Sequence, residues 1–277
     1  MKRSLTLKLL MSLAILSINL HAGSEEDKVL DFFKEAINSS SQYTLTNIKI
    51  LNKQDVKEIK DFRAYSVKID LKLVGKDKTI SLNDIVFTNG SVLSKDFLFL
   101  DSRRSIKDTI SPDIDESFYN QSHFIEGSFE AVNKLVVFSD PLCPSCMDVI
   151  PDVIKFVRAH PKDFALFYYN FPLSIHKGAK TLVKASIVAK KFNKDVLLKL
   201  YEEALDLEKT DEVSVLALFN KIMGTKLTLE EINQKEVVDF MESDIELAKD
   251  YMVRGTPTLY INGKKDLTKI AYKKMVK

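Results

Sequence analysis

The pattern of apolar and polar residues in the first part of the chain predicts one helix followed by an antiparallel sheet. Residues 27–38 carry apolar side chains at helical spacing. Strand patterns follow at residues 43–51, 63–74, 78–88 and 97–100. In the second of these strands apolar residues alternate with polar ones, which is typical of a sheet with one face in water. We predict a small helix-plus-antiparallel-sheet domain over residues 23–104, and association is its simplest role.

The next segment, residues 105–128, combines a helix start with an incomplete apolar stripe. Ser111 suits an N-cap and Pro112 suits a first helical turn, while Gly127 suits the end of the helix. We predict a linker helix between two domains here. The alternative is an ordinary packed helix within one continuous domain.

Residues 129–277 alternate between strand and helix patterns. Strands are expected at 134–138, 165–171 and 258–261, and helices at 147–157, 179–192, 196–205, 213–223 and 230–253. Strand–helix–strand order predicts an α/β domain with a partly parallel sheet, and the run of helices is an insertion within it. With the antiparallel N-terminal domain, the whole chain is of the α+β class.

The first 22 residues have the pattern of a secretory signal peptide. Lys2 and Arg3 precede an apolar stretch from Leu9 to Leu20, and small residues follow. The stretch is short for a membrane span, which needs about 20 apolar residues. We predict cleavage and a periplasmic protein, with an uncleaved anchor as the alternative.

The net charge of the chain argues against nucleic acid as a partner. Loss of residues 1–22 removes three basic residues and no acid, so the formal net charge of +2 becomes −1. A nearly neutral protein lacks the basic surface that binds phosphate backbones.

The chain has two cysteines, Cys143 and Cys146, spaced C-x-x-C. Cys143 falls at the junction between an expected strand and an expected helix. The unpaired N–H groups and the dipole of a helix N-terminus stabilise a thiolate, which is the chemistry of thiol–disulfide exchange. We predict Cys143 as the nucleophile and Cys146 as the resolving thiol. A ring this small stabilises a fold little through chain entropy, so a structural disulfide is the weaker interpretation.

Pro144 and Ser145 lie between the cysteines and are expected to tune their redox chemistry. Proline suits an early helical position because its missing N–H costs nothing there. None of the histidines lies at metal-ligand spacing from the cysteines. We predict no metal and no cofactor beyond the redox-active pair. Asp140 is expected to be a turn or capping residue, and His176 a surface or capping residue.

A second motif, Gly255-Thr256-Pro257, precedes the last strand pattern. At this distance downstream of C-x-x-C it predicts a cis Thr256–Pro257 peptide bond, which proline makes accessible. The backbone of Thr256 would then lie beside Cys143, where it could pair with an extended substrate segment. We predict Thr256 and Pro257 as substrate-binding residues.

With these residues in view, the chain resembles the periplasmic DsbC/DsbG family of thioredoxin-fold thiol:disulfide oxidoreductases. The resemblance rests on F-x-D-P-x-C-P-x-C at residues 138–146, on Thr256-Pro257, and on the order of the expected domains. It implies a cystatin-like N-terminal dimerisation domain, a thioredoxin-like catalytic domain and a V-shaped homodimer. It also implies unfolded or misoxidised secreted proteins as substrates and a membrane electron donor of the DsbD type.

Departures from that family leave the direction of electron flow open. The Pro-Ser dipeptide differs from the best-known isomerase pair, and a second cysteine pair is absent. Phe171-Pro172-Leu173 followed by His176 is more similar to DsbA-like oxidases. We predict a disulfide isomerase or reductase. The alternatives are a DsbA-like oxidase in a dimeric DsbG-like scaffold, with a DsbB-type partner, and a periplasmic chaperone without enzymatic activity. A reductase for cytochrome maturation is a third, weaker alternative.

Overall fold

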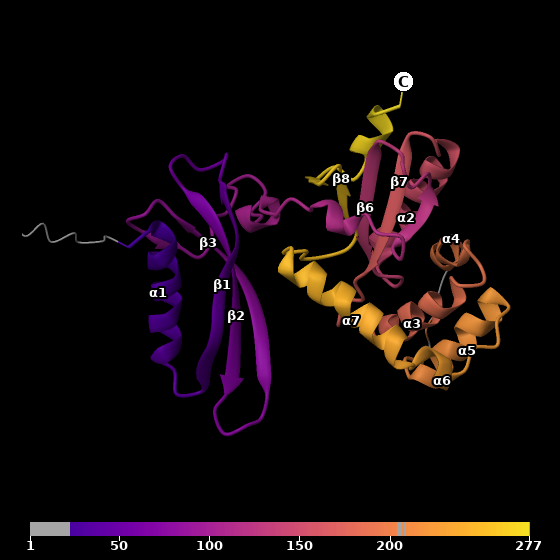
Figure 1. Ribbon diagram of the computed structural model, residues 1–277, viewed down its shortest axis with the longest axis horizontal. Helices are drawn as coiled ribbons and strands as arrows, with labels where there is room; N and C mark the ends of the chain where they lie inside the picture. Colours follow the sequence, from indigo (N-terminus) through magenta and orange to yellow (C-terminus); the bar gives the residue numbers. More distant parts are fainter. Residues whose placement is uncertain (1–22, 204–206, 208, 277) are drawn as a thin grey trace, which may run out of the picture.

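Two β-sheets organise the chain in the computed structural model, which describes residues 23–203, 207 and 209–276 (Figure 1). The signal-peptide prediction for residues 1–22 lies outside these described residues. The first sheet is antiparallel, with the order β1 (Tyr43–Asp55), β2 (Arg63–Leu73), β3 (Thr79–Thr88) and β4 (Leu93–Ser94). The second has the order β5 (Phe124–Gly127), β7 (Phe164–Asn170), β6 (Asn133–Ser139), β8 (Thr258–Ile261) and β9 (Lys264–Asp266).

Helix α1 (Glu25–Asn38) packs on the first sheet, so the predicted helix-plus-antiparallel-sheet unit is confirmed. Ser24 caps the helix, because its side chain accepts a hydrogen bond from the Asp27 N–H while Asp27 bonds back to the Ser24 N–H. Val29 and Phe33, one turn apart, are buried against β2. The predicted strand at 97–100 is wrong. The chain reverses at once after Phe99, and the segment makes only an isolated bridge.

The second sheet has the partly parallel arrangement that the strand–helix–strand order predicts. Strands β6 and β7 are parallel, and the other pairs are antiparallel. All seven residues of β7 are buried, which is typical of a strand covered on both faces. Along β6, Leu135 and Val137 face one apolar cluster, and Val136 and Phe138 face another. The two faces of this sheet therefore have separate cores.

Helices cover both faces of the second sheet (Figure 1). They are α2 (Pro144–Ala159), α3 (Ala179–Ala189), α4 (Val196–Glu202), α5 (Glu212–Met223), α6 (Leu229–Ile232) and α7 (Lys235–Asp250). Helix α2 packs in the cluster that contains Leu135, and α7 packs in the cluster that contains Val136. Pro151 lies within α2, which runs on past it. The helix predicted for 196–205 ends at Glu202, and residues 204–206 are outside the described chain.

The single helix predicted for 230–253 is instead two helices, α6 and α7. Thr228 and Glu231 form a capping box that starts α6. Gln234 then adopts an extended conformation and becomes the N-cap of α7. The extended cap residue separates two helices whose apolar spacing is continuous in the sequence.

The predicted linker helix over residues 105–128 is wrong. The segment contains 3-10 turns at Ile106–Thr109 and Glu116–Phe118, followed by strand β5. The N–H of Ile114 donates to the Gly263 carbonyl at 2.9 Å, and Phe118 is buried in the core beneath α7. These tertiary contacts with the second sheet outweigh an incomplete helical stripe. The domain boundaries themselves stay a prediction.

The first sheet contacts the chain that leads into the Thr256-Pro257 motif. Lys68 of β2 pairs with Asp250 at the end of α7 at 2.7 Å, and the Asn83 side chain donates to the Lys249 carbonyl at 2.6 Å. Met252 belongs to the apolar cluster of the first sheet. The N-terminal unit is therefore attached a few residues upstream of Thr256. Within the described residues, every helix is too short or too polar to cross a bilayer.

Candidate active site

Cys143 is the N-cap of α2 and follows the end of β6, so the predicted strand-to-helix junction is confirmed. Its carbonyl accepts hydrogen bonds from the N–H groups of Cys146 and Met147, at 2.9 and 3.2 Å, which form the first turn of the helix. Pro144 occupies the first helical position, as expected. The Cys143 side chain makes no capping bond to the helix. Its sulfur is therefore free to face another group.

That group is the Thr256 carbonyl, 3.2 Å from Cys143 Sγ. The Thr256–Pro257 peptide bond is cis, as the sequence predicts. The thiol donates to the carbonyl, so the two motifs meet although they lie 113 residues apart. The backbone of Thr256 thus lies beside Cys143, as predicted from the sequence.

Cys146 is in a different environment, because no part of it is exposed. Burial, together with a smaller effect of the nearby Cys143, raises the pKa of the Cys146 thiol to about 12. Hydrogen bonding by the Asp140 backbone and by the Ser139 and Thr256 side chains acts to lower this pKa. Both cysteines are free thiols in this structure. One sulfur therefore lies at the edge of the site and the other is enclosed beneath it.

Asp140 shapes the loop that leads to Cys143. Its buried carboxylate accepts hydrogen bonds from the N–H groups of Leu142 and Leu173, each at 2.7 Å. His176 Nδ1 lies 2.8 Å from the same carboxylate. The expected turn role of Asp140 is confirmed. The pairing of Asp140 with His176 was not foreseen. The only signal for it in the sequence is that Leu173 and His176 follow a proline.

Three buried hydroxyl groups lie next to Cys146. The hydroxyl of Tyr201 on α4 is 2.7 Å from Ser139 Oγ and 2.6 Å from the hydroxyl of Tyr168. We call Ser139, Tyr201 and Tyr168 the hydroxyl chain. Tyr168 and Tyr201 belong to the same apolar cluster as Cys146. The hydroxyl chain was not foreseen, because no local pattern relates Tyr201 to Ser139, which lies 62 residues earlier.

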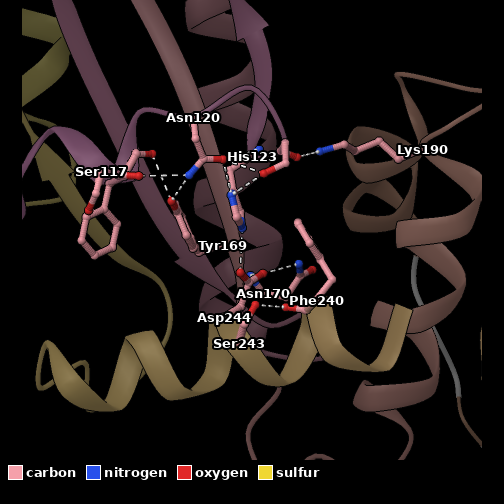
Figure 2. A network of polar contacts seen from close by, with 11 residues as sticks. Ser117, Asn120, His123, Tyr169, Asn170, Lys190, Phe240, Ser243 and Asp244 are labelled. Carbon is pink, nitrogen blue, oxygen red and sulfur yellow. Dashed lines mark hydrogen bonds and ion pairs between the residues drawn. The ribbon is translucent and has the colours of Figure 1, made fainter. Parts of the chain in front are cut away.

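A second polar network occupies the opposite face of the sheet (Figure 2). His123 Nε2 lies 2.7 Å from Asp244 of α7, and Nδ1 lies 2.7 Å from Asn120 Oδ1. Both ring nitrogens face oxygen atoms. The other Asp244 oxygen accepts from the N–H and the side chain of Asn170, at 2.9 and 2.7 Å. We call His123, Asp244, Asn120 and Asn170 the His123 network.

Aromatic rings enclose the imidazole of this network. The His123 ring stacks on Tyr169 at 3.8 Å and on Phe240 at 4.7 Å between centroids (Figure 2). The network ties α7 to β7 and to the chain preceding β5. It was not foreseen, since its members come from three separate parts of the sequence.

A cavity of about 330 Å³ lies between β7, α3 and α7, and its lining includes neither cysteine. Among the described residues, no group of three or more His, Cys, Asp and Glu side chains could hold a metal ion. Thiol–disulfide exchange needs no cofactor, because the cysteine pair itself carries the electrons.

Comparison with known proteins agrees with this architecture. The thioredoxin family matches residues 120–277, which is more than half of the chain. Probable disulfide bond formation protein D of Bacillus cereus is 27% identical over 149 residues, covering 50% of this chain and 68% of that protein. The same match is found with the protein of that name from Bacillus anthracis.

Two solved structures illustrate the structural likeness. BdbD from Bacillus subtilis, in its oxidised form, is 21% identical with a TM-score of 0.47, covering 60% of this chain and 93% of that one. ScsC from Proteus mirabilis, in a transitional conformation, is 19% identical with a TM-score of 0.47, and the match covers 58% of this chain and 72% of that one. The family match, the fold and the cysteine pair at the helix start agree, and the chain belongs to the thioredoxin family as a thioredoxin-fold thiol:disulfide oxidoreductase.

Proposed function

We propose that Cys143 attacks substrate disulfides and that Cys146 resolves the resulting mixed disulfide. The position of Cys143 Sγ carries this proposal: it lies at the start of α2 and 3.2 Å from the Thr256 carbonyl. Thr256 and Pro257 would bind an extended segment of the substrate beside the sulfur. Pro144 and Ser145, which separate the two cysteines, would tune the redox potential.

The reaction is two successive exchanges of sulfur partners. The Cys143 thiolate forms a bond to one substrate sulfur, and the other substrate sulfur leaves with the electron pair and takes up a proton. Cys146 then displaces the substrate, so that the substrate is reduced and a Cys143–Cys146 disulfide forms. In isomerisation a thiol of the substrate takes the place of Cys146, and no net electron transfer occurs.

The first candidate direction is isomerisation or reduction of misoxidised secreted proteins by a periplasmic homodimer of the DsbC/DsbG type. In this proposal the N-terminal unit, residues 23–104, is a cystatin-like dimerisation domain. Large apolar side chains are exposed on this unit, namely Phe32, Val74, Leu82, Val92, Leu98 and Leu100. A membrane donor of the DsbD type would keep the cysteines reduced. In this proposal residues 1–22 are the signal peptide.

The second candidate is a dithiol oxidase, and two observations favour it. The relatives of the catalytic part are named as disulfide bond formation proteins. In addition, the segment predicted to link the two domains forms no helix, unlike the expectation from the DsbC/DsbG resemblance. A DsbB-type partner would then reoxidise the pair. A chaperone without enzymatic activity remains the candidate from another class.

Ribonuclease refolding distinguishes these candidates. An isomerase reactivates scrambled ribonuclease, whereas an oxidase reactivates reduced ribonuclease. Cys146→Ser is expected to accumulate a mixed disulfide with substrate through Cys143, and Cys143→Ser is expected to form none. If Cys143→Ser keeps full activity in both assays, the exchange mechanism is rejected and the chaperone is favoured. Light scattering of the purified protein tests the homodimer.

A further inference from the structure

The resolving step requires a thiolate in a place that solvent does not reach. Cys146 is fully buried, and burial raises the pKa of its thiol to about 12. A thiol is a poor nucleophile compared with its thiolate. Groups that stabilise the charged sulfur would therefore speed the displacement of substrate from Cys143.

Few charged groups are available to do this. In the described part of the chain, the titratable groups that act on this cluster are Cys143, Asp140, Tyr168 and Tyr201. The Asp140 carboxylate is already occupied by two N–H donors and His176. Burial keeps both tyrosine pKa values well above their usual range, so their hydroxyls stay protonated.

The hydroxyl chain has the required chemistry. A hydroxyl both accepts and donates hydrogen bonds, and its proton rotates to suit its neighbours. The Ser139 side chain acts to lower the pKa of the Cys146 thiol against the effect of burial. Its Oγ lies 2.7 Å from the Tyr201 hydroxyl, which in turn lies 2.6 Å from that of Tyr168. Hydrogen bonds in such a chain polarise and strengthen one another in a medium of low dielectric constant.

We propose that the hydroxyl chain stabilises the Cys146 thiolate during the resolving step, through a hydrogen bond from Ser139 that Tyr201 and Tyr168 reinforce. This inference rests on the proposed roles of the two cysteines. In this proposal Ser139 donates to the reacting sulfur, and the two tyrosines are positioning residues that act through Ser139.

Every atom is accounted for in the step. Cys146 loses its thiol proton and its sulfur attacks Cys143 Sγ of the mixed disulfide. The Cys143–Cys146 bond forms as the bond between Cys143 and the substrate sulfur breaks, and the leaving sulfur takes up the proton. The Ser139 hydroxyl accepts from the sulfur while it is a thiol and donates to it when it is charged, and each of the three hydroxyls keeps its own proton.

The test uses the reduced full chain and one equivalent of 5,5′-dithiobis(2-nitrobenzoate), followed by stopped-flow absorbance over a range of pH. The first release of thionitrobenzoate reports attack by Cys143, and the second reports resolution by Cys146. Tyr201→Phe is expected to slow the second release about tenfold at neutral pH, the size of a hydrogen bond to a charged group. It is also expected to move the pH profile of this release to higher pH, with the first release unchanged.

Tyr169→Phe is the matched control. It removes a buried hydroxyl from the next residue of β7, on the opposite face of the sheet, where that group bonds to Asn120 and the Phe118 carbonyl. Both releases should keep wild-type rates. Tyr168→Phe should slow the second release in the wild-type background but add nothing to Ser139→Ala, since its effect passes through Ser139.

Distinct outcomes reject the two proposals. A second release in Tyr201→Phe with the wild-type rate and pH profile rejects the hydroxyl chain, and so does equal slowing by Tyr169→Phe. If the wild-type protein releases only one thionitrobenzoate, the proposed roles of the cysteines fail first. Should Tyr201→Phe not fold by circular dichroism, Ser139→Ala measures the same effect.

Discussion

The two faces of the five-stranded sheet bury polar groups of different kinds. Tyr168 and Tyr169 are neighbours on β7 but point to opposite faces, one into the hydroxyl chain and the other against the His123 network. Hydroxyl groups surround Cys146, and the ionisable pair on its side, Asp140 and His176, lies in the loop beyond the end of β6. The far face buries an ionisable pair, His123 and Asp244, within the packing of α7 against β7.

This difference separates the groups around Cys146 from the groups that hold α7 against the sheet. A fixed charge near a buried sulfur would favour one protonation state strongly, because Coulomb interactions are large in a medium of low dielectric constant. Neutral hydroxyls adapt to both states of the sulfur. The ionisable pair, on the other face, can hold α7 against β7 without acting on Cys146.

The largest expected effect on stability comes from removing one member of the His123–Asp244 pair. Asp244→Ala should lower the free energy of unfolding by about 3–5 kcal/mol, since it leaves His123 and Asn170 buried without their acceptor. Urea unfolding at neutral pH measures it. Asp239→Ala is the control, because Asp239 lies on the same helix in an exposed pair with Lys235 and should cost about 0–1 kcal/mol. Equal losses in the two variants would show that the His123 network is no anchor.

Stability should depend less on the hydroxyl chain beside Cys146. Tyr201→Phe removes one hydroxyl and leaves the two others each short of one partner, so we expect a loss of about 1–2 kcal/mol in the same assay. A loss as large as that of Asp244→Ala would remove the contrast between the two faces.

The pH dependence of stability sharpens the description of Cys146. Burial raises the pKa of this thiol from 9.0 to about 12, so the unfolded chain ionises first as pH rises. The stability that the buried, neutral Cys146 thiol contributes is fully present below pH 9 and is lost between pH 9 and pH 12. The stability of the wild type relative to Cys146→Ala should therefore fall by about 1 kcal/mol from about pH 8 to about pH 10. Between about pH 6 and pH 8 it should stay constant, and a change there would contradict the assignment.

The smallest expected effect is that of salt on the stability cost of Asp244→Ala. Raising NaCl from about 0.1 M to about 1 M shortens the screening length, but buried pairs are screened little. The cost of Asp244→Ala should change by less than about 0.5 kcal/mol in urea titrations at the two salt concentrations. A strong salt dependence would mean that the His123 network is open to solvent.

The parts of the site that follow local patterns were predictable. An apolar strand before Cys143 and a proline after it define the junction, and Thr256-Pro257 precedes the last long strand pattern. The linker helix failed because an incomplete apolar stripe carries less weight than contacts that the sequence does not reveal, such as that of Phe118 beneath α7.

Local sequence patterns locate Cys143 in the fold, because helix starts, strand runs and proline geometry depend on neighbouring residues. The surroundings of Cys146 and the contacts that hold α7 in place depend on tertiary packing. Tyr201 reaches Ser139 across 62 residues and His123 reaches Asp244 across 121. Such contacts depend on how whole elements pack, and side-chain hydroxyls, imidazoles and carboxylates leave no periodic signal that would disclose them.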